Sequence, residues 1–410
     1  MEKLSRYTLV FIAIFVLSIV VPQLYWTAFE VPAKTPFVQY SCVNHDFLIY
    51  RPGEKKWQDT KGNQYTRDEY EQRLPLFFFK QLYTSGTLPD SVNNQPLDMR
   101  SLSREKSFFR LKTADIDAPK NNLFPMFESR SGRAMLEWPD DFFRITWRIE
   151  FIDAATNKVL EEKSQMFSAA MFHNGFVFPA KNIWGISSPK KSVDEGYFIV
   201  DSRDQLFHLK MVKGKPFVRK IDLPAGLKFR HIDCVDFKNR TFYAYLFSEK
   251  NEIYILTQDD YKLMRWPVNG YNPEITDIKI YGDLYNYTVI MESPGEVKAV
   301  VLDKNYQYVD SYTETWPVRE DTKVGKIFTS VFPAQISLTS DTSKFVSFYF
   351  NLSGGFYWLV LNFFLVILQL IWLYWKKKIF RNHVADLVIV AVCGVFGMIA
   401  VHLFPNKFYK

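Results

Sequence analysis

The sequence predicts a membrane-anchored protein with three transmembrane helices and a large extracytoplasmic domain, which is α+β N-terminally and built from all-β, propeller-like repeats C-terminally. Three observations support this fold class. Three long apolar runs lack charged residues, Lys and Arg gather beside those runs, and a strand–turn–strand pattern recurs in the second half of the chain. At 410 residues the chain is also too long for one ordinary domain.

The three apolar runs cover residues 8–26, 356–375 and 387–404, and none of them contains Asp, Glu, Lys or Arg. Each is about as long as a helix that crosses the ~30 Å hydrocarbon core of a bilayer. The first run could instead belong to a cleaved signal peptide, because Lys3 and Arg6 precede it. Its end does not resemble a small-residue cleavage site, so we favour an uncleaved anchor.

Positive charge sets the predicted orientation. Residues 1–6 carry two Lys or Arg, and the loop 376–383 between the second and third runs carries four. Short positive segments stay in the cytoplasm. Both segments lie there only if residues 27–355 are outside, and the tail 405–410 would then also be outside.

The overall charge argues against one class of partner. The formal net charge is +7, which is small for a chain of this size. The sequence shows no basic stripe of the kind that nucleic-acid binding needs. We therefore expect the lipid bilayer, and not nucleic acid, as a partner.

The outer region from 27 to 175 reads as a mixture of strands and helices. Residues 36–64 look β-rich, and Thr66 with Glu69 forms a capping-box pattern that predicts a helix start. Residues 143–167 read as a long hairpin around the turn sequence DAATNK. Together these patterns predict an α+β region.

Residues 176–350 contain the repeat. The segments FIVDSRDQLFHL, YLFSEKNEIYIL and VIMESPGEVKAV start at Phe198, Tyr245 and Val289, which are 47 and 44 residues apart. Each has an apolar run, a polar turn and then alternating apolar residues, with a further strand before and after. Corresponding apolar positions are Leu206, Ile253 and Val297, and Leu209, Leu256 and Val300.

Four strands at a period of about 40 to 50 residues are typical of a propeller blade. The alternative is an ordinary antiparallel sandwich with coincidental spacing. Residues 324–350 could form another blade, and the β-rich segment near 36–50 could close the ring with it. The number of blades is left open by the sequence.

The chain lacks the recognisable motifs of catalysis. It has no GxxxxGK[ST], no GxGxxG after a strand, no GxSxG and no HExxH. We therefore expect a protein that is not an enzyme and that needs no cofactor.

One set of residues allows several interpretations. Cys42 and His45 form C-x-x-H, and His231 and Cys234 form its mirror image, H-x-x-C. Two thiols and two imidazoles could hold a metal ion. The two cysteines could instead pair as a disulfide in an oxidising compartment, or all four residues could be unrelated parts of the core.

The second and third apolar runs contain residues suited to helix packing. Asn362 and Gln369 are seven residues apart, hence on one helix face. A stripe of small residues in the third run permits close approach of another helix. Its members are Ala391, Gly394, Gly397 and Ala400. The two runs could pack on each other, or dock on a partner membrane protein, or both.

Three phrases carry a resemblance to a known family: LFPMFESRSGRAMLEWPDDFFRI, IEFIDAATNKV and NGFVFPAK. They resemble segments of a family of uncharacterised inner-membrane proteins of Gram-negative bacteria, defined by a domain of unknown function and often encoded beside ABC-transporter subunits. The resemblance implies an inner-membrane protein with a periplasmic main domain and an accessory role. It implies no catalytic residues.

The sequence thus predicts a non-enzymatic accessory or partner-binding subunit of an ABC-type transport system. One alternative is a periplasmic sensor or ligand-binding protein, although the cytoplasmic segments 1–6 and 376–383 are too short for a signalling domain. The other is a membrane-anchored enzyme with a propeller active site, whose residues would come from distant loops.

Overall fold

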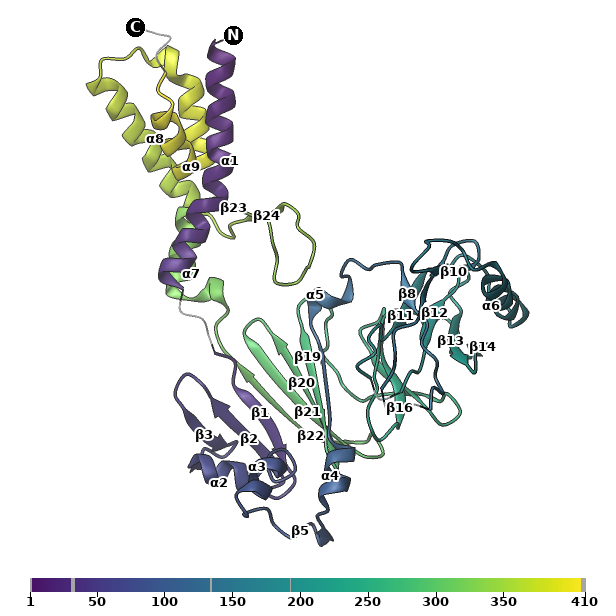
Figure 1. Cartoon of the computed structure of the whole chain (residues 1–410). Helices are drawn as coiled ribbons and strands as arrows, with labels where there is room; N and C mark the ends of the chain where they lie inside the picture. The colour runs from purple at the N-terminus through teal and green to yellow at the C-terminus, as the bar shows by residue number, and fades with distance from the viewer. Residues whose placement is uncertain (1, 31–33, 133–134, 192, 407–410) are drawn as a thin grey trace. The chain divides into compact units, whose positions relative to one another are not determined.

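The computed structural model describes residues 2–30, 34–132, 135–191 and 193–406 (Figure 1). The described chain divides into two compact units. We name residues 35–293 and 297–314 the β-rich unit, and the remaining described residues the helical unit.

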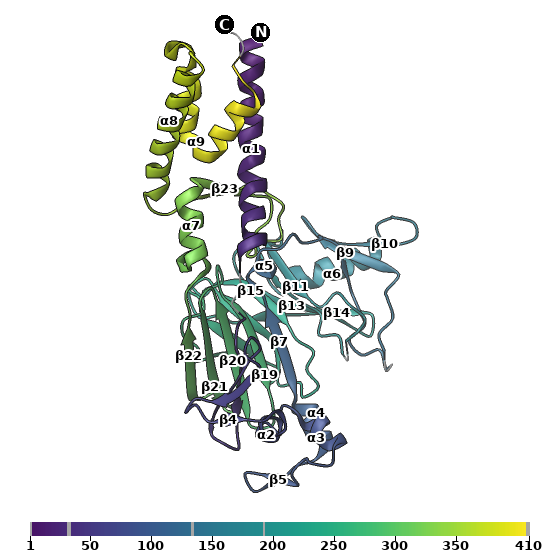
Figure 2. The ribbon, with the colours of Figure 1, turned by 90° about the vertical axis from the view of Figure 1, so that its left-hand side faces the viewer.

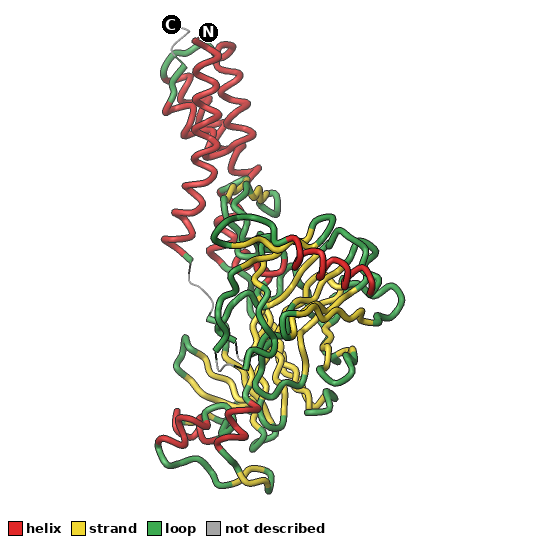
Figure 3. Tube along the Cα trace, turned by 45° about the vertical axis from the view of Figure 1, so that its right-hand side comes forward, coloured by secondary structure: helices red, strands yellow, loops and turns green. Residues whose placement is uncertain are grey.

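The repeat prediction is confirmed at the level of individual sheets. Each of the three predicted copies contributes four strands that are hydrogen-bonded in chain order within one sheet, and Figure 3 shows how strands dominate this unit. The first sheet contains β11 (Asn182–Gly185), β12 (Tyr197–Val200), β13 (Leu206–Val212) and β14 (Lys215–Ile221). The second contains β15 (Phe229–Cys234), β16 (Phe242–Ser248), β17 (Ile253–Thr257) and β18 (Leu263–Arg265). The third contains β19 (Asp277–Gly282), β20 (Asn286–Ser293), β21 (Glu296–Asp303) and β22 (Tyr308–Thr315).

The corresponding apolar positions of the repeats are buried, as alternating strands on a packed sheet require. All six side chains expose 2% of their surface or less: Leu206, Leu209, Ile253, Leu256, Val297 and Val300. The third sheet has a fifth strand that comes from far upstream. Strand β7 (Ser107–Leu111) pairs antiparallel with β19, in a segment for which the sequence shows no clean period.

The N-terminal part of the β-rich unit mixes strands and short helices. One sheet joins β1 (Phe37–Ser41), β2 (Asp46–Arg51), β3 (Lys56–Asp59) and β4 (Gln64–Tyr65). Its other elements are α2 (Arg67–Gln72), α3 (Phe79–Thr84), β5 (Ser91–Val92), β6 (Gln95–Pro96), α4 (Met99–Glu105) and α5 (Thr113–Ile116). The predicted capping box is confirmed, because Thr66 and Glu69 bond reciprocally at the start of α2.

The long hairpin predicted for residues 143–167 is wrong in its second half. Strand β10 (Ile149–Asp153) pairs instead with the preceding β9 (Asp141–Ile145), and β8 (Phe124–Pro125) completes that sheet. After the DAATNK turn, Val159 forms a single antiparallel bridge with Ile152, and the chain then continues as α6 (Glu161–His173) and not as a second strand. Two glutamates favour its positive N-terminus, and Phe167 and Met171 are buried at the four-residue spacing of a helix face.

The helical unit holds the three apolar runs. Within the described residues, three helices are long and apolar enough to span a membrane: Lys3–Phe29, Tyr357–Trp375 and Phe380–Leu403. The unit consists of α1 (Glu2–Phe29), η1 (Arg319–Asp321), α7 (Lys323–Val331), β23 (Ala334–Ser337), β24 (Tyr349–Leu352), α8 (Tyr357–Trp375), η2 (Phe380–His383) and α9 (Val384–Leu403).

Residues 324–350 do not form the additional blade that the sequence allows. They form α7 and the hairpin of β23 and β24, which pair only with each other in the described structure. The reason is the spacing of the aromatic residues. Phe328 and Phe332 are four apart, as on a helix face; Phe328 packs against Trp26 of α1, and Phe332 packs against Phe396 of α9.

Helix α9 turns back on itself at Gly394, whose φ of 57° and ψ of −129° are not helical. A straight helix of its 20 residues would be about 30 Å long. Its two ends nevertheless meet. Arg6 donates to Asp386 at 2.7 Å and to the carbonyl of Phe404 at 2.8 Å. Figure 2 shows α9 descending beside α1 and returning.

The predicted crossing by residues 387–404, with the tail on the far side, stays a prediction, and the fold-back makes it testable. Asn406 donates to the carbonyl of Asn382, so residue 406 lies beside the loop that follows α8. We expect a cysteine appended to the C-terminus to react with membrane-impermeant thiol reagents from the same face as Lys377→Cys. The measurement is labelling of spheroplasts, intact and permeabilised, in a background with the three native cysteines replaced.

Lys213→Cys in the β-rich unit is the control for the opposite face. If the appended cysteine is labelled together with Lys213→Cys, α9 crosses the bilayer and the fold-back does not exist in the membrane.

Candidate functional site

A large hollow of the described β-rich unit lies where the first strands of two consecutive repeats meet. Its volume is about 570 Å³, within the range of about 300–1,000 Å³ that is usual for small-molecule sites. Strands β11 and β15 form one wall, and the segment before and including β8 forms another. The lining residues are Asp115, Lys120, Asn121, Leu123, Phe124, Pro125, Trp138, Phe142, Ile183, Trp184, Gly185, Ser187, His231, Ile232, Asp233 and Cys234. We name this hollow the β11–β15 pocket.

Four aromatic residues contribute to the walls of the β11–β15 pocket: Phe124, Trp138, Phe142 and Trp184. Trp184 is buried on β11, whereas Trp138 is 57% exposed at the rim and packs against Phe142. The ammonium of Lys120 lies 4.8 Å from the centre of the Trp184 ring. Large, rigid rings around a hollow favour a flat apolar ligand, because they give much contact area for little loss of side-chain freedom.

Two residues that line the pocket each carry a buried polar atom that has no hydrogen-bond partner among the described residues. These atoms are Nε1 of Trp184 and Nδ1 of His231, on residues that are only 5% and 7% exposed. A buried polar group without a partner costs about 1–3 kcal/mol, so each of these two atoms needs an explanation, such as an ordered water or a polar group of a ligand. An indole N–H can only donate, and the ligand should therefore offer an acceptor.

The charged groups of the pocket are few and mixed. The other imidazole nitrogen of His231, Nε2, lies 3.7 Å from the Asp233 carboxylate. Burial lowers the pKa of Lys120, whereas the nearby Asp117 carboxylate opposes this. Burial also raises the pKa of the Cys234 thiol, which leaves it protonated and unreactive at neutral pH.

The structure does not bring the four metal or disulfide candidates together. His231 and Cys234 line the β11–β15 pocket, whereas Cys42 lines a different cavity and His45 is exposed in the turn after β1. Cys42 and Cys234 are free thiols in the described part of the chain. No group of three or more His, Cys, Asp or Glu that could hold a metal occurs among the residues described.

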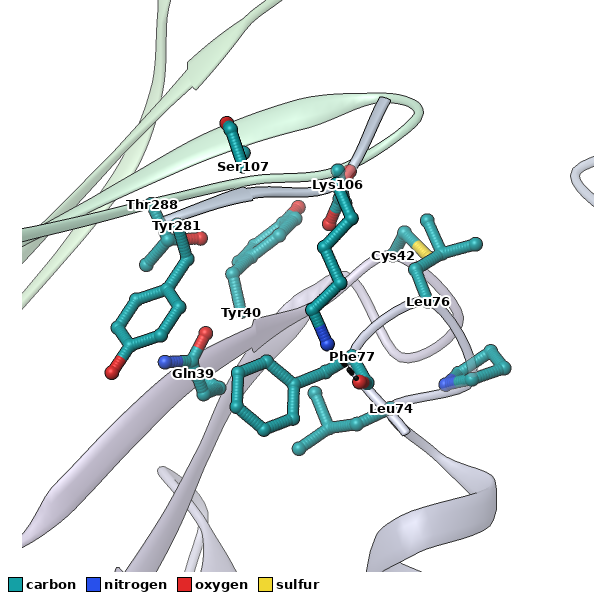
Figure 4. Close-up of a pocket in the computed structure, with 13 residues that line it drawn as sticks. Gln39, Tyr40, Cys42, Leu74, Leu76, Phe77, Lys106, Ser107, Tyr281 and Thr288 are labelled. Atoms are coloured by element: carbon teal, nitrogen blue, oxygen red, sulfur yellow. Dashed lines mark hydrogen bonds between the residues drawn. The ribbon is translucent and has the colours of Figure 1, made fainter. Parts of the chain in front are cut away.

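The cavity that contains Cys42 lies between β1, the segment before α3 and the end of β19 (Figure 4). It offers water-sized molecules only about 20 Å³, which is room for about one water. Lys106 donates to the carbonyl of Phe77 beside it, and Nε2 of Gln39 has no partner in the described protein. A bound water would satisfy Gln39, and the cavity is too small for an organic ligand.

The predicted packing residues of the membrane helices meet within this chain. Asn362 of α8 donates to the carbonyl of Ala391 at 2.9 Å, and Gln369 bonds His402 at 2.9 Å. A side chain at Gly394 would overlap the Asn362 amide. Ala400 is fully buried beside Val10 of α1.

The two remaining residues of the small-residue stripe, Gly397 and Ala391, differ in burial. Gly397 is buried, and a Cβ there would lie 2.6 Å from the carbonyl of Ile389 in the first half of α9. Ala391 is exposed and is free to contact lipid or another protein. Most of the predicted stripe therefore serves the packing of α9 on α8, on α1 and on itself.

The sequence interpretation missed two features. The first is the buried cluster of Arg6, His383 and Asp386, in which the carboxylate lies 2.7 Å from Arg6 and 3.2 Å from His383. Asp386 adjoins the third apolar run, and an acid at that place is a signal for a membrane-embedded ion pair. The second is the position of Trp184 in the wall of the β11–β15 pocket, which no local sequence pattern indicates.

Comparisons with known proteins define a family. A family described as "Domain of unknown function (DUF4857)" matches residues 37–302. No curated protein shows significant similarity to the chain. Among solved structures, dihydro-heme d1 dehydrogenase NirN in complex with DHE is similar over 69% of this chain and 55% of its own, with 9% identity and a TM-score of 0.22. The chain therefore spans about half the length of that protein, and so low a TM-score carries no argument about fold or function. The matched segment covers most of the β-rich unit, and the chain belongs to the DUF4857 family.

Proposed function

We propose that the protein is a membrane-anchored, non-enzymatic binding protein whose β-rich unit holds a small aromatic compound with a hydrogen-bond acceptor. The observation that carries the proposal is the β11–β15 pocket. It combines aromatic walls with two buried, unpartnered polar atoms, on Trp184 and His231. Absence of a recognisable nucleophile or base in the sequence agrees with binding more than with catalysis.

The proposal places the β-rich unit outside the cytoplasm, in the periplasm of a bacterium. The positive charges of residues 1–6 and 376–383 support this orientation through the positive-inside tendency. The apolar helices α1 and α8 provide the anchor at either end of the unit's sequence.

We also propose that the sheets stand around a common axis as blades of an incomplete propeller. Each repeat contributes four strands to one sheet, and β11 and β15 are the first strands of consecutive repeats. The first strands of propeller blades line the central channel, where propellers bind ligands. The β11–β15 pocket would then be the mouth of that channel.

We further propose that the protein is an accessory of an ABC-type transport system, and a separate observation supports this role. The loop 376–383 is too short to carry a signalling domain, so any message from the β-rich unit must pass to another protein in the membrane. Affinity capture of the full chain in mild detergent tests this role. Recovery of transporter membrane subunits supports it, and their absence from every capture refutes it.

A thermal-shift experiment tests the binding function. We expect aromatic carboxylates, with indole-3-acetate as the first probe, to raise the melting temperature of the full chain in detergent. Trp184→Phe keeps an aromatic ring but removes the N–H and the five-membered part of the indole, and should weaken the affinity at least about three- to ten-fold, which is the effect of losing one neutral hydrogen bond.

Trp147→Phe is the matched control, because Trp147 is 83% exposed and lies outside the pocket. It should bind as the parent does. Equal affinities for the parent, Trp184→Phe and His231→Phe would show that the probe binds elsewhere, and the proposed site would be wrong.

A further inference from the structure

The helical unit contains a polar hollow that the binding function does not use. Its volume is about 730 Å³, and it lies between the end of α1, α7 and the hairpin of β23 and β24 (Figure 1). The lining is mostly hydroxyl, amide and charged side chains, with Trp26 and Phe328 at one side. We name it the hairpin hollow.

The hairpin hollow lies at the depth of lipid headgroups if α1 spans a bilayer. Ile19, Gln23 and Trp26 line it, and they lie in the second half of the apolar run 8–26. Aromatic residues such as Trp26 prefer the zone between acyl chains and water. The ring of Phe348, just before β24, lies 5.5 Å from the ring of Phe15 in the middle of α1.

The outer face of the hairpin is unsuited to water. Three apolar side chains in and beside β24 lie outside the lining of the hollow and are more than half exposed, which is unusual for so short a segment. Their exposed fractions are 80% for Val346, 66% for Phe348 and 61% for Phe350. Acyl chains would cover these side chains, as they cover the apolar faces of α1 and α8.

The inner face of the hairpin is polar and unsatisfied. The side chains of Gln23, Gln335, Ser337 and Asn351 line the hollow and form no hydrogen bond with any described residue. Polar groups at membrane depth need partners, because hydrocarbon offers none. The partner must be a polar group that reaches the hollow from the bilayer or from its surface.

Charge indicates which headgroup fits. Arg319 lines the hollow but lies 3.3 Å from Glu30 and stacks 3.7 Å from the centre of the Trp26 ring. The carboxylates of Glu320 and Asp341 line the hollow without an ion pair among the described residues. The free charge is negative, which disfavours an anionic headgroup and favours one that carries an amine.

We propose that the hairpin hollow binds the headgroup of a zwitterionic phospholipid, of the phosphoethanolamine type, with its acyl chains against the outer face of the hairpin. Amides and hydroxyls bind the phosphate oxygens, and the two free carboxylates attract the amine. This site is separate from the β11–β15 pocket and does not depend on its ligand.

Native mass spectrometry of the full chain tests the proposal. The protein is exposed in detergent to phosphatidylethanolamine or phosphatidylglycerol, and retained lipid is counted. We expect selective retention of phosphatidylethanolamine. Ser337→Leu with Asn351→Leu fills the hollow and should reduce retention about ten-fold, which corresponds to about 1.4 kcal/mol of binding free energy.

The matched control is Asn305→Leu with Ser311→Leu, the same chemical change at exposed positions of the β-rich unit. It should retain lipid as the parent does. Preference for phosphatidylglycerol, no retention by the parent, or equal retention by the filled variant would each overturn the proposal.

A second measurement stays informative if the filled variant misfolds. A spin label at Val346→Cys in otherwise native protein, in bilayers of phosphatidylethanolamine and phosphatidylcholine, should be more accessible to oxygen than to a water-soluble nickel complex. Greater accessibility to the nickel complex would place the hairpin in water and refute the lipid site.

Discussion

Asp386→Ala is expected to destabilise the helical unit by about 3–5 kcal/mol, the usual cost of leaving one partner of a buried ion pair uncompensated. In the native structure the Asp386 carboxylate lies 2.7 Å from Arg6, and the two side chains expose only 3% and 6% of their surface. Without the carboxylate, the guanidinium of Arg6 stays buried with the Phe404 carbonyl as its remaining acceptor.

A matched set of variants separates the cost of leaving one charge buried and unpaired from the cost of losing the attraction between the two charges. Arg6→Met with Asp386→Leu removes both charges and should recover most of the stability, because no group is then left uncompensated. Glu30→Ala breaks the half-exposed pair with Arg319 and should cost at most about 1 kcal/mol. Thermal unfolding followed by helical circular dichroism of the full chain measures all four proteins.

Equal shifts of the melting temperature by Asp386→Ala and Glu30→Ala would show that the buried cluster of Arg6, His383 and Asp386 does not stabilise the helical unit. The same conclusion follows if the double variant is no more stable than Asp386→Ala. His383→Phe extends the test, since His383 Nδ1 lies 3.2 Å from the same carboxylate.

Gly394→Leu is expected to abolish the fold-back of α9. The backbone at Gly394 has a positive φ, which costs any other residue about 1–3 kcal/mol. The new side chain would also overlap the Asn362 amide, and overpacking typically adds about 1–3 kcal/mol. Straightening α9 would relieve both the backbone strain at residue 394 and the overlap with Asn362.

Crosslinking gives a direct measurement of this change. Asn382→Cys with Asn406→Cys should form a disulfide on oxidation in the parent, where the amide of Asn406 bonds the Asn382 carbonyl. The same pair should fail to crosslink when Gly394→Leu is added. Efficient crosslinking in both proteins would show that Gly394 is not the turning point.

Ala391→Leu is the control, because Ala391 belongs to the same small-residue stripe but is exposed. It should leave crosslinking unchanged. If a partner membrane protein docks on the stripe, Ala391→Leu should also release that partner, whereas Gly394→Leu would disturb the protein's own packing first.

Local patterns in the sequence determined much of this protein. The apolar runs gave the three long helices, the recurring turn with flanking apolar residues gave the three sets of four strands, and Thr66 with Glu69 gave a helix start. These features depend on neighbours a few residues apart, so the period of the side chains and the residues at turns and caps are enough to specify them.

Tertiary structure decided the features that depend on distant segments. Strand β7 joins β19 across more than half of the β-rich unit, and Arg6 meets Asp386 from the other end of the chain. The β11–β15 pocket likewise needs Trp184 and His231 on strands of different sheets. Local sequence patterns do not indicate which strand edges, charged groups or aromatic rings from distant segments will come into contact. Those contacts are determined only when the whole chain has packed.

The turn at Gly394 shows where local sequence stops determining the structure and tertiary contacts begin to decide it. The sequence marks it as a small residue in an apolar helix, which agrees equally with a straight span, a dimer seam or a bend. The bend is selected because Asn362 occupies the space beside Gly394 and bonds the Ala391 carbonyl, while Arg6 binds both ends of α9. A residue without a side chain permits several backbone paths, and only the contacts around it choose one.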